Sequence, residues 1–287
     1  MEYINCPICE VNDSEFFYDK ERNNDPVMYV ICKKCGLVYQ NPRKTYEEYK
    51  IYYQEEFRKQ NIAGHNIDDY INSRIKSGKE ILKIIEQYYP IRLMDRLKKK
   101  YTGNRKVSVL DVGCGAGGII YPFISKGYTC VGIDAPSEYT KIGREKLGVD
   151  IKDVFILDFD PKNKFDIIIL NHSLEHFLEP VNYLIKIREL LSKHGIVYIE
   201  VPDIERPYSW TSLRYFFMLG HVFYYSPVTL TVLLNKCGFE MIYIESGKTA
   251  FMRSLFIKKN DTNYKVNSKY YTEIINKFNS IKEEKNE

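Results

Sequence analysis

The residues with the clearest chemical meaning form a glycine-rich turn near the middle of the chain. Val-Leu-Asp-Val at 109–112 has the apolar character of a buried strand, and Gly113, Gly115 and Gly117 follow it at alternate positions. Glycine tolerates positive φ and lets the backbone approach a ligand closely. In open α/β sheets, ligands bind beyond the carboxyl ends of the strands. The spacing therefore predicts a turn that binds a nucleoside-bearing ligand.

Two carboxylates accompany this turn. Asp134 closes the next predicted strand, and a carboxylate there can accept two hydrogen bonds from a ribose diol. Asp111 lies just before the first glycine, where it can hold an ammonium group of the ligand, which a pyrophosphate lacks. The same stretch also satisfies G-x-G-x-x-G, so the spacing alone leaves a dinucleotide site, or a purely structural turn, as alternatives.

Two Cys-x-x-Cys pairs stand near the start of the chain, at 6–9 and 32–35. Four thiolates on two such knuckles can hold one zinc ion tetrahedrally, and a site with no open coordination position is predicted to be structural. Metal binding would add folding energy that the small core of a module of about 45 residues lacks. The alternatives are unrelated or redox-active thiols. The predicted ligands are Cys6, Cys9, Cys32 and Cys35.

These residues must be positioned by a sheet whose strands alternate with helices. Apolar runs such as Phe-Asp-Ile-Ile-Ile-Leu at 165–170 indicate strands covered on both faces, and repeated strand–helix units indicate a doubly wound parallel sheet. The last two predicted strands are joined by only four residues, which permits a hairpin and forbids a parallel crossover. We therefore predict an α/β fold with a mostly parallel seven-stranded sheet that ends in an antiparallel hairpin. The predicted strands are 107–112, 129–133, 154–157, 165–170, 196–201, 239–245 and 250–257.

Four segments are predicted along the chain. Residues 1–45 form the zinc ribbon, and residues 46–104 form a helical linker or lid with apolar side chains at helical spacing. Residues 105–260 form a Rossmann-like domain that carries the glycine turn. Residues 261–287 are predicted to be a polar tail that ends rich in lysine and glutamate.

Composition and charge narrow the classes of function. The 287 residues are 44% hydrophobic and 28% charged, so a folded core is expected. A net charge of +4, from 42 basic and 38 acidic residues, is too small for a nucleic-acid footprint. No apolar run is long enough to span a membrane, and the first ten residues lack the basic start and apolar stretch of a signal peptide. We therefore expect a cytoplasmic protein whose cysteines are metal ligands or free thiols.

The ordered motifs resemble those of the class I S-adenosylmethionine-dependent methyltransferases. The resemblance runs from about residue 107 to 257 and includes D-x-G-x-G-x-G at 111–117, Val-Gly-Ile-Asp at 131–134 and Ser-Leu-Glu-His at 173–176. Together with the acidic residue before the glycines and the terminal hairpin, it favours S-adenosylmethionine over a dinucleotide. The resemblance implies a cofactor site in which Gly113 and Gly115 line the methionine part, Asp134 binds the ribose, Asp158 contacts the adenine amino group, and Asn171 and His172 line the cleft.

Two histidines are candidates for the base that an alcohol or carbon acid requires for methyl transfer. His221 lies in an aromatic stretch between the fifth strand and a late helix, a region that the resemblance places over the acceptor. An unperturbed histidine pKa of about 6.5 suits proton transfer at neutral pH. His176 is the second candidate, and for both the alternative is a structural histidine. Neighbouring aromatic residues are predicted to shape the acceptor pocket, namely Tyr208, Trp210, Tyr215, Tyr224 and Tyr225.

The combination of a zinc ribbon with this cofactor site is similar to methyltransferases of sugar, polysaccharide and secondary-metabolite pathways. It predicts methyl transfer by in-line displacement to a small molecule, at a hydroxyl of a nucleotide sugar or other glycan precursor. RNA methylation, with the ribbon gripping the nucleic acid, is an alternative that the many acidic residues of the ribbon disfavour. A non-catalytic binding module that retains the cofactor fold is another. The sequence leaves the acceptor, the methylated atom and the oligomeric state open.

Overall fold

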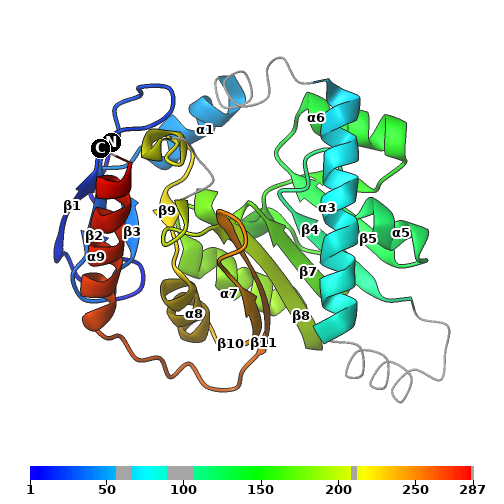
Figure 1. Ribbon diagram of the computed structural model, residues 1–287. Coiled ribbons are helices and arrows are strands. Elements are labelled where there is room, and N and C mark those ends of the chain that lie inside the picture. Colours follow the sequence, from blue (N-terminus) through cyan, green and yellow to red (C-terminus); the bar gives the residue numbers. More distant parts are fainter. Residues whose placement is uncertain (56–65, 89–105, 208–211, 286–287) are drawn as a thin grey trace.

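A computed structural model describes the chain except for residues 56–65, 89–105, 208–211 and 286–287 (Figure 1). Within this described part, the strands form one sheet of seven strands and one of four. The linker predicted at 46–104 falls partly outside the described residues, which include its helices α1 (Tyr46–Glu55) and α3 (Ile67–Tyr88). No described helix is both long and apolar enough to cross a membrane.

The seven-stranded sheet confirms the predicted fold class. Its strand order is β10-β11-β8-β7-β4-β5-β6. The strands from β8 to β6 pair in parallel, whereas β11 pairs antiparallel with both β8 and β10. The members are β4 (Ser108–Val112), β5 (Thr129–Asp134), β6 (Ile151–Asp153), β7 (Phe165–Asn171), β8 (Leu191–Pro202), β10 (Phe239–Glu245) and β11 (Phe251–Lys258).

Strand order reverses beside β4, because the chain continues from β4 outward to β5 and β6 and then returns to β7 on the other side. The connections after β4 and after β7 therefore diverge, and a crevice is expected between the carboxyl ends of these two strands. The predicted glycine turn follows β4, and Asn171 ends β7, so both lie at this edge of the sheet.

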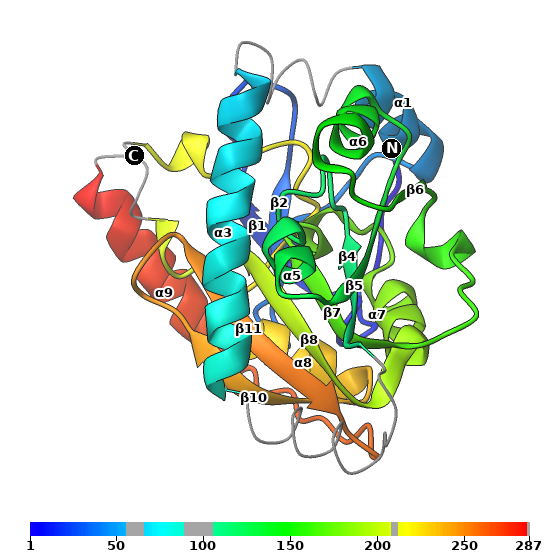
Figure 2. The same ribbon diagram turned by 90° about the vertical axis from the view of Figure 1, so that its right-hand side faces the viewer.

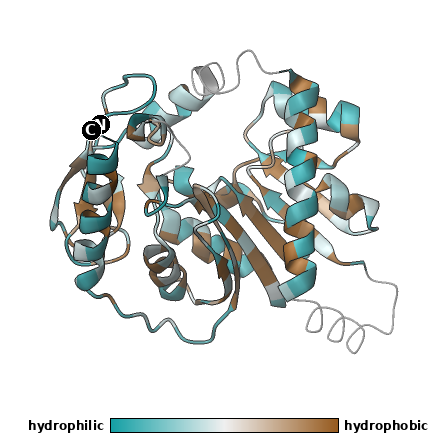
Figure 3. Ribbon diagram, in the orientation of Figure 1, coloured by the Kyte–Doolittle hydropathy of each residue, from teal (hydrophilic) through white to brown (hydrophobic). Residues whose placement is uncertain are grey.

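Helices cover both faces of the sheet, with α3 crossing one face (Figures 1 and 2). Alternate residues of β7 divide between the two faces. Ile167 and Ile169 belong to the apolar core under α3 and α5, whereas Ile168 and Leu170 belong to the core under α7 and α8. The central strands are accordingly largely apolar (Figure 3), as burial on both faces requires. The bounds of these helices and of α6 are α5 Tyr121–Ser125, α6 Glu138–Ile142, α7 Pro180–Leu190 and α8 Pro227–Lys236.

The N-terminal residues form the smaller, antiparallel sheet, whose order is β1-β2-β3-β9. Three of its strands, β1 (Ser14–Tyr18), β2 (Tyr29–Cys32) and β3 (Val38–Gln40), come from the N-terminal segment. The fourth, β9 (Phe223–Tyr224), comes from far downstream and pairs with β3. Directly after β9, Tyr225 forms a parallel backbone bridge with Asp203, which follows β8, and so connects the two sheets.

The C-terminal segment, predicted to be a polar tail, contains the amphipathic helix α9 (Lys269–Glu284). Ile274, Phe278 and Ile281 of α9 are buried in a core shared with the smaller sheet, and the Phe278 ring stacks on Phe17 of β1 at a centroid distance of 4.1 Å. The segment is polar overall, so the sequence analysis did not predict this helix. Its three apolar residues lie at helical spacing and form a single buried stripe.

The third parallel strand lies earlier than predicted. The sequence predicts it at 154–157, whereas β6 spans Ile151–Asp153 and a single 3₁₀ turn covers Ile156–Asp158. The reason is the neighbouring strand: β5 ends at Asp134, which pairs with Asp153, so later residues have no strand beside them. The apolar side chains of Phe155 and Leu157 are instead 42% and 45% exposed.

Candidate functional site

The glycine turn folds tightly against the ends of β5 and β7. The backbone N–H groups of Gly113 and Cys114 both donate to the carbonyl of Ile133, at 2.9 and 3.2 Å. Gly113 and Gly115 have φ of +77° and +55°, and a Cβ added to them would lie 2.5 Å from Ser173 Oγ and 2.7 Å from the Tyr70 hydroxyl. Both positions therefore require glycine for conformation and for space.

Asp134 links the turn to the end of β5. One carboxylate oxygen accepts the N–H of Gly115 at 2.7 Å, and the other accepts the N–H of Ala135 at 2.7 Å. The carboxylate is therefore held beside the turn, at the strand end where the sequence predicts it. Gly117 lies deeper in the fold, because a Cβ there would be 2.9 Å from Cγ1 of Val149.

Asp111 is a buried carboxylate below the turn. It is 1% exposed, and its Oδ2 has no hydrogen-bond partner within the described part of the chain. Burial raises its pKa to about 7, although the nearby charge of Arg74 acts in the opposite direction. A buried acid without a partner is costly. The arrangement favours a cationic ligand group at this position.

Arg74 of α3 is a member of the site that sequence reasoning missed. Its guanidinium donates to the side-chain oxygen of Asn171, whose Nδ2 has no partner among the described residues. The helix approaches the turn so closely that a Cβ on Gly118 would lie 2.7 Å from the Arg74 Cβ. Helical periodicity predicted the apolar stripe of α3, but it does not show which part of the sheet that stripe covers. Arg74 and the carboxylate of Asp111, whose Oδ2 is unpartnered in the described part of the chain, therefore both lie at the carboxyl ends of β4 and β7.

His172 follows β7 directly and has a left-handed backbone, with φ of +54°. Its Nδ1 lies 3.3 Å from Glu175 Oε1, and its Nε2 lies 3.4 Å from Glu200 Oε1. Burial lowers its pKa, but the two carboxylates outweigh that effect and raise the pKa to about 9. Burial raises the pKa of Glu200, but the bonds and charges of His172, Tyr198 and Arg253 together outweigh it and lower the pKa to about 2. His172 is therefore a cation at neutral pH.

His176 and His221 lie together on the other side of Glu175. Their rings are 4.8 Å apart between centroids, and Nε2 of His221 lies 3.9 Å from Oε1 of Glu175. Burial lowers the pKa of both histidines, and for His221 the neighbouring His176 and His172 lower it further. Both imidazoles are therefore neutral near pH 7, which is the form that can accept a proton.

The hydrogen bonds of Tyr224 favour one tautomer of His221. The Tyr224 hydroxyl donates its single proton to the carbonyl of Phe216 at 3.0 Å, and its oxygen lies 3.2 Å from His221 Nδ1. Nδ1 of His221 must then be the donor of that contact. The lone pair is left on Nε2, which faces the fully buried Glu175.

A family model described as a methyltransferase domain matches residues 83–244. The chain belongs to this methyltransferase family. The ubiquinone biosynthesis O-methyltransferase of Rhodopseudomonas palustris (strain TIE-1) is 30% identical to it over 115 residues, which are 38% of this chain and 45% of that protein. That of Actinobacillus pleuropneumoniae serotype 5b (strain L20) is 31% identical over 127 residues, 40% of this chain and 54% of that protein. The match thus spans about half the length of these curated relatives.

Two solved structures share the fold of this methyltransferase. The plantazolicin methyltransferase BpumL in complex with SAH has a TM-score of 0.54 at 16% identity, covering 73% of this chain and 93% of that one. A Burkholderia thailandensis 1,6-didemethyltoxoflavin-N1-methyltransferase has a TM-score of 0.50 at 15% identity, covering 85% of this chain and 100% of that one.

The methyltransferase brings its four N-terminal cysteines together. Their sulfur atoms all lie within 4.8 Å of one another, and the Cys6 and Cys35 sulfurs are 3.6 Å apart, much too far for a disulfide. Both knuckles are closed by backbone bonds, from Glu10 N–H to the Cys6 carbonyl and from Gly36 N–H to the Cys32 carbonyl. Four thiols in this arrangement suit a tetrahedral metal ion.

A second group of possible metal ligands lies at the histidine cluster. One ligand atom each of Glu175, His176 and His221 falls within 4.8 Å of the others. His176 uses Nδ1 to contact the Gly220 carbonyl at 2.8 Å, so an ion or a proton would have to bind at its Nε2.

The remaining predicted residues are less closely connected to this site. Asp158 is exposed in the turn after β6, and no side-chain hydrogen bond from it is described. Tyr215 is 46% exposed, whereas Tyr224 and Tyr225 are buried. Tyr208 and Trp210 lie outside the described residues.

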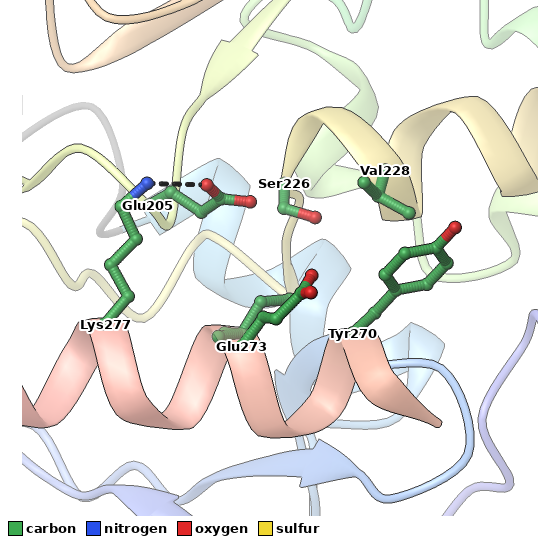
Figure 4. A pocket seen from close by; sticks show the side chains of 7 residues that line it. Glu205, Ser226, Val228, Tyr270, Glu273 and Lys277 are labelled. Atoms are coloured by element: carbon green, nitrogen blue, oxygen red, sulfur yellow. Dashed lines mark hydrogen bonds and ion pairs between the residues drawn. The ribbon is translucent and has the colours of Figure 1, made fainter. Parts of the chain in front are cut away.

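A small cavity of about 170 Å³ lies where α9 meets the start of α8 (Figure 4). The Lys277–Glu205 ion pair, at 2.7 Å, closes one side of it. Its lining contains no residue of the glycine turn or the histidine cluster, so we do not assign it to the cofactor or the acceptor. The lining residues are Glu205, Ser226, Val228, Tyr270, Glu273, Ile274 and Lys277.

Replacing His172 by glutamine should destabilise the protein in a pH-dependent way. Because the folded pKa is about 9 and the unfolded value is about 6.5, the stabilisation is complete below pH 6.5 and is lost as the pH rises through 9. The side chain is 25% exposed, so we expect a loss on the order of 1–2 kcal/mol at pH 6 and almost none at pH 10. Urea unfolding of both proteins at these two pH values measures it. An equal difference at both would contradict the assignment.

Proposed function

We propose that the chain transfers a methyl group from S-adenosylmethionine to a hydroxyl of a small molecule. The observation that carries this proposal is that a buried carboxylate, Asp111, and a guanidinium, Arg74, lie near each other at the glycine turn. The methionine part of S-adenosylmethionine bears an ammonium and a carboxylate, and the unpartnered Oδ2 of Asp111 and the guanidinium of Arg74 are complementary to them. The absence of side chains at Gly113 and Gly115 leaves the backbone accessible beside them.

The other predicted cofactor contacts fit around this anchor. Asp134 would exchange its bonds to the turn for the ribose hydroxyls, and Asn171 would offer its unpartnered Nδ2. His172 would line the cleft as a fixed cation, and Asp158 would reach the adenine amino group from the turn after β6. These assignments rest on the family resemblance and on the position of each residue at the carboxyl edge of the sheet.

The proposed base is His221. S-adenosylmethionine supplies a methyl group already activated on a positively charged sulfur, so the protein has to align the acceptor and remove its proton. Nε2 of His221 carries the lone pair that would take this proton. The resulting imidazolium would face the carboxylate of Glu175, 3.9 Å away. His176, the second candidate, holds the backbone at Gly220 and is proposed to support His221 instead.

The acceptor is proposed to be a nucleotide sugar or another glycan precursor. The cysteine module beside the acceptor region supports this class through the resemblance to sugar and polysaccharide methyltransferases. The O-methyltransferases among the curated relatives support oxygen as the methylated atom.

The cysteine module is proposed to hold one structural zinc ion through Cys6, Cys9, Cys32 and Cys35. The convergence of four sulfurs supports it.

Calorimetry with S-adenosylmethionine tests the central proposal. Asp111→Asn should weaken binding about tenfold or more, because it removes the charge that faces the ammonium. Asp19→Asn, an exposed change directly after β1, is the control and should bind like the unmodified protein. If the unmodified protein shows no heat of binding, the proposal is wrong.

Metal analysis tests the zinc site. The purified protein should contain one zinc per chain, and Cys35→Ser should lose most of it because one thiolate ligand is removed. Cys130→Ser, at a buried thiol in β5, should retain the metal. A protein purified without chelators that lacks zinc would refute the assignment.

Turnover with a panel of nucleotide sugars tests the base and the acceptor class. His221→Ala should lower kcat by roughly 10²–10⁴-fold, the usual contribution of general-base catalysis, without changing cofactor affinity. Unchanged kcat would exclude His221 as the base. No methylated product from any nucleotide sugar would reject this acceptor class and leave the cofactor proposal intact.

A further inference from the structure

The backbone beside His221 connects the N-terminal sheet with the turn that follows β7. The N–H of Val222 donates to the carbonyl of Glu175 at 2.9 Å, and the carbonyl of Val222 accepts the N–H of Gln40 at 2.9 Å. The next two residues are β9, in which Tyr224 pairs with Val38 of β3. His221 therefore lies in the turn that leads directly into β9, the edge strand of the N-terminal sheet.

Side chains of the same sheet hold the turn before His221. The single proton of the Tyr29 hydroxyl is shared between the carbonyls of Met218 and His221, at 2.8 and 3.2 Å. Nε2 of Gln40 donates to the carbonyls of Leu219 and His221, at 2.9 and 3.0 Å. Tyr29 and Gln40 are 0% and 2% exposed, so water does not substitute for these donors.

A third side chain fixes the amide of Gln40. The Tyr49 hydroxyl donates to Oε1 of Gln40 at 2.8 Å, which identifies the other atom of that amide as the donor. The carbonyl of Leu219, 3.1 Å from the same hydroxyl, shares this single proton. The carbonyls of Met218, Leu219 and His221 are thus all bound by side chains of β2, β3 and α1.

We propose that Tyr29 and Gln40 are positioning residues for His221, so that the N-terminal cysteine module forms part of the acceptor site. This inference rests on the proposed role of His221. The module holds the turn in the conformation that brings Nδ1 of His221 to Tyr224 and directs Nε2 towards Glu175. Tyr224 completes the arrangement from β9, whose own position is set by pairing with β3.

The cysteines connect this positioning to the proposed metal. Cys32 is the last residue of β2, and the second knuckle, Cys32 to Cys35, leads directly into β3. A metal ion in the cluster would therefore close the hairpin that carries Tyr29 on one strand and Gln40 on the other. A zinc ion remote from the chemistry would in this way determine the orientation of the proposed base.

Nitrogen-15 NMR of the histidine side chains tests this without a known acceptor. The zinc-loaded protein with S-adenosylhomocysteine should show His221 as a neutral ring protonated at Nδ1, identified by the signals that His221→Gln removes. Tyr224→Phe should move the proton to Nε2, because Glu175 is then the remaining polar partner of the ring. Tyr29→Phe and Gln40→Met should each give a loss of the single Nδ1-protonated species, through mixed tautomers or broadened signals.

Tyr39→Phe is the matched control, because Tyr39 is equally buried in the adjacent strand and no described hydrogen bond joins it to the 218–221 turn. It should leave the His221 signals unchanged. Removing zinc with a chelator should reproduce the Tyr29→Phe spectrum while the His172 signals stay, since His172 is held by Glu175 and Glu200. Thermal unfolding identifies any variant that fails to fold. If Gln40→Met fails, the test of the positioning role rests on the spectrum of Tyr29→Phe, which removes only a hydroxyl.

Unchanged His221 signals in both Tyr29→Phe and Gln40→Met would overturn the positioning role. This outcome differs from failure of the proposed function. Absence of cofactor binding in calorimetry would refute methyl transfer whatever the histidine spectrum shows. If His221→Ala leaves turnover intact, the base assignment and the positioning role are both wrong.

Discussion

The reversal of strand order beside β4 is the constraint on which the candidate site at the carboxyl edge of the sheet depends. Parallel strands buried on both faces cannot present ligand groups from their interiors, so the chemistry is confined to the strand ends. At the reversal, the connections after β4 and β7 separate, so the polar ends of these two strands lie side by side. Asp111 and Asn171 occupy these positions, and α3 brings Arg74 to the same edge.

Polar groups buried at this edge lower the stability of the fold unless they are paired or bind a ligand. Glu175 is fully buried, with one oxygen unpartnered in the described residues, and His172 adopts a backbone conformation that few non-glycine residues tolerate. Structures retain such features where the surroundings fix them and where function requires them. Here the carboxylates of Glu175 and Glu200 hold one histidine charged, while burial keeps His176 and His221 neutral. One cluster therefore provides both a fixed cation and proton acceptors.

The parts of this structure that the sequence predicts are those encoded by neighbouring residues. The strands, the terminal hairpin, the glycine turn and the cysteine pairs each have a local signature. Arg74 does not, because the periodicity of α3 leaves open which strands it crosses. The exchange of β9 into the N-terminal sheet and the packing of α9 on that sheet depend on contacts between distant segments. Even β6 lies earlier than its apolar run indicates, because its length is set by the end of β5.

The pairing of β3 with β9 also has a consequence for how the chain reaches its native state. Val38 pairs with Tyr224, and Phe17 packs on Phe278, so both contacts join segments from opposite ends of the described chain. Strands β1 to β3 therefore leave the ribosome well before their edge strand and covering helix are synthesised. Such non-local contacts slow folding, and the early sheet exposes an unpaired edge in the meantime. The N-terminal module of the nascent chain is then exposed to mispairing and aggregation until β9 and α9 have emerged.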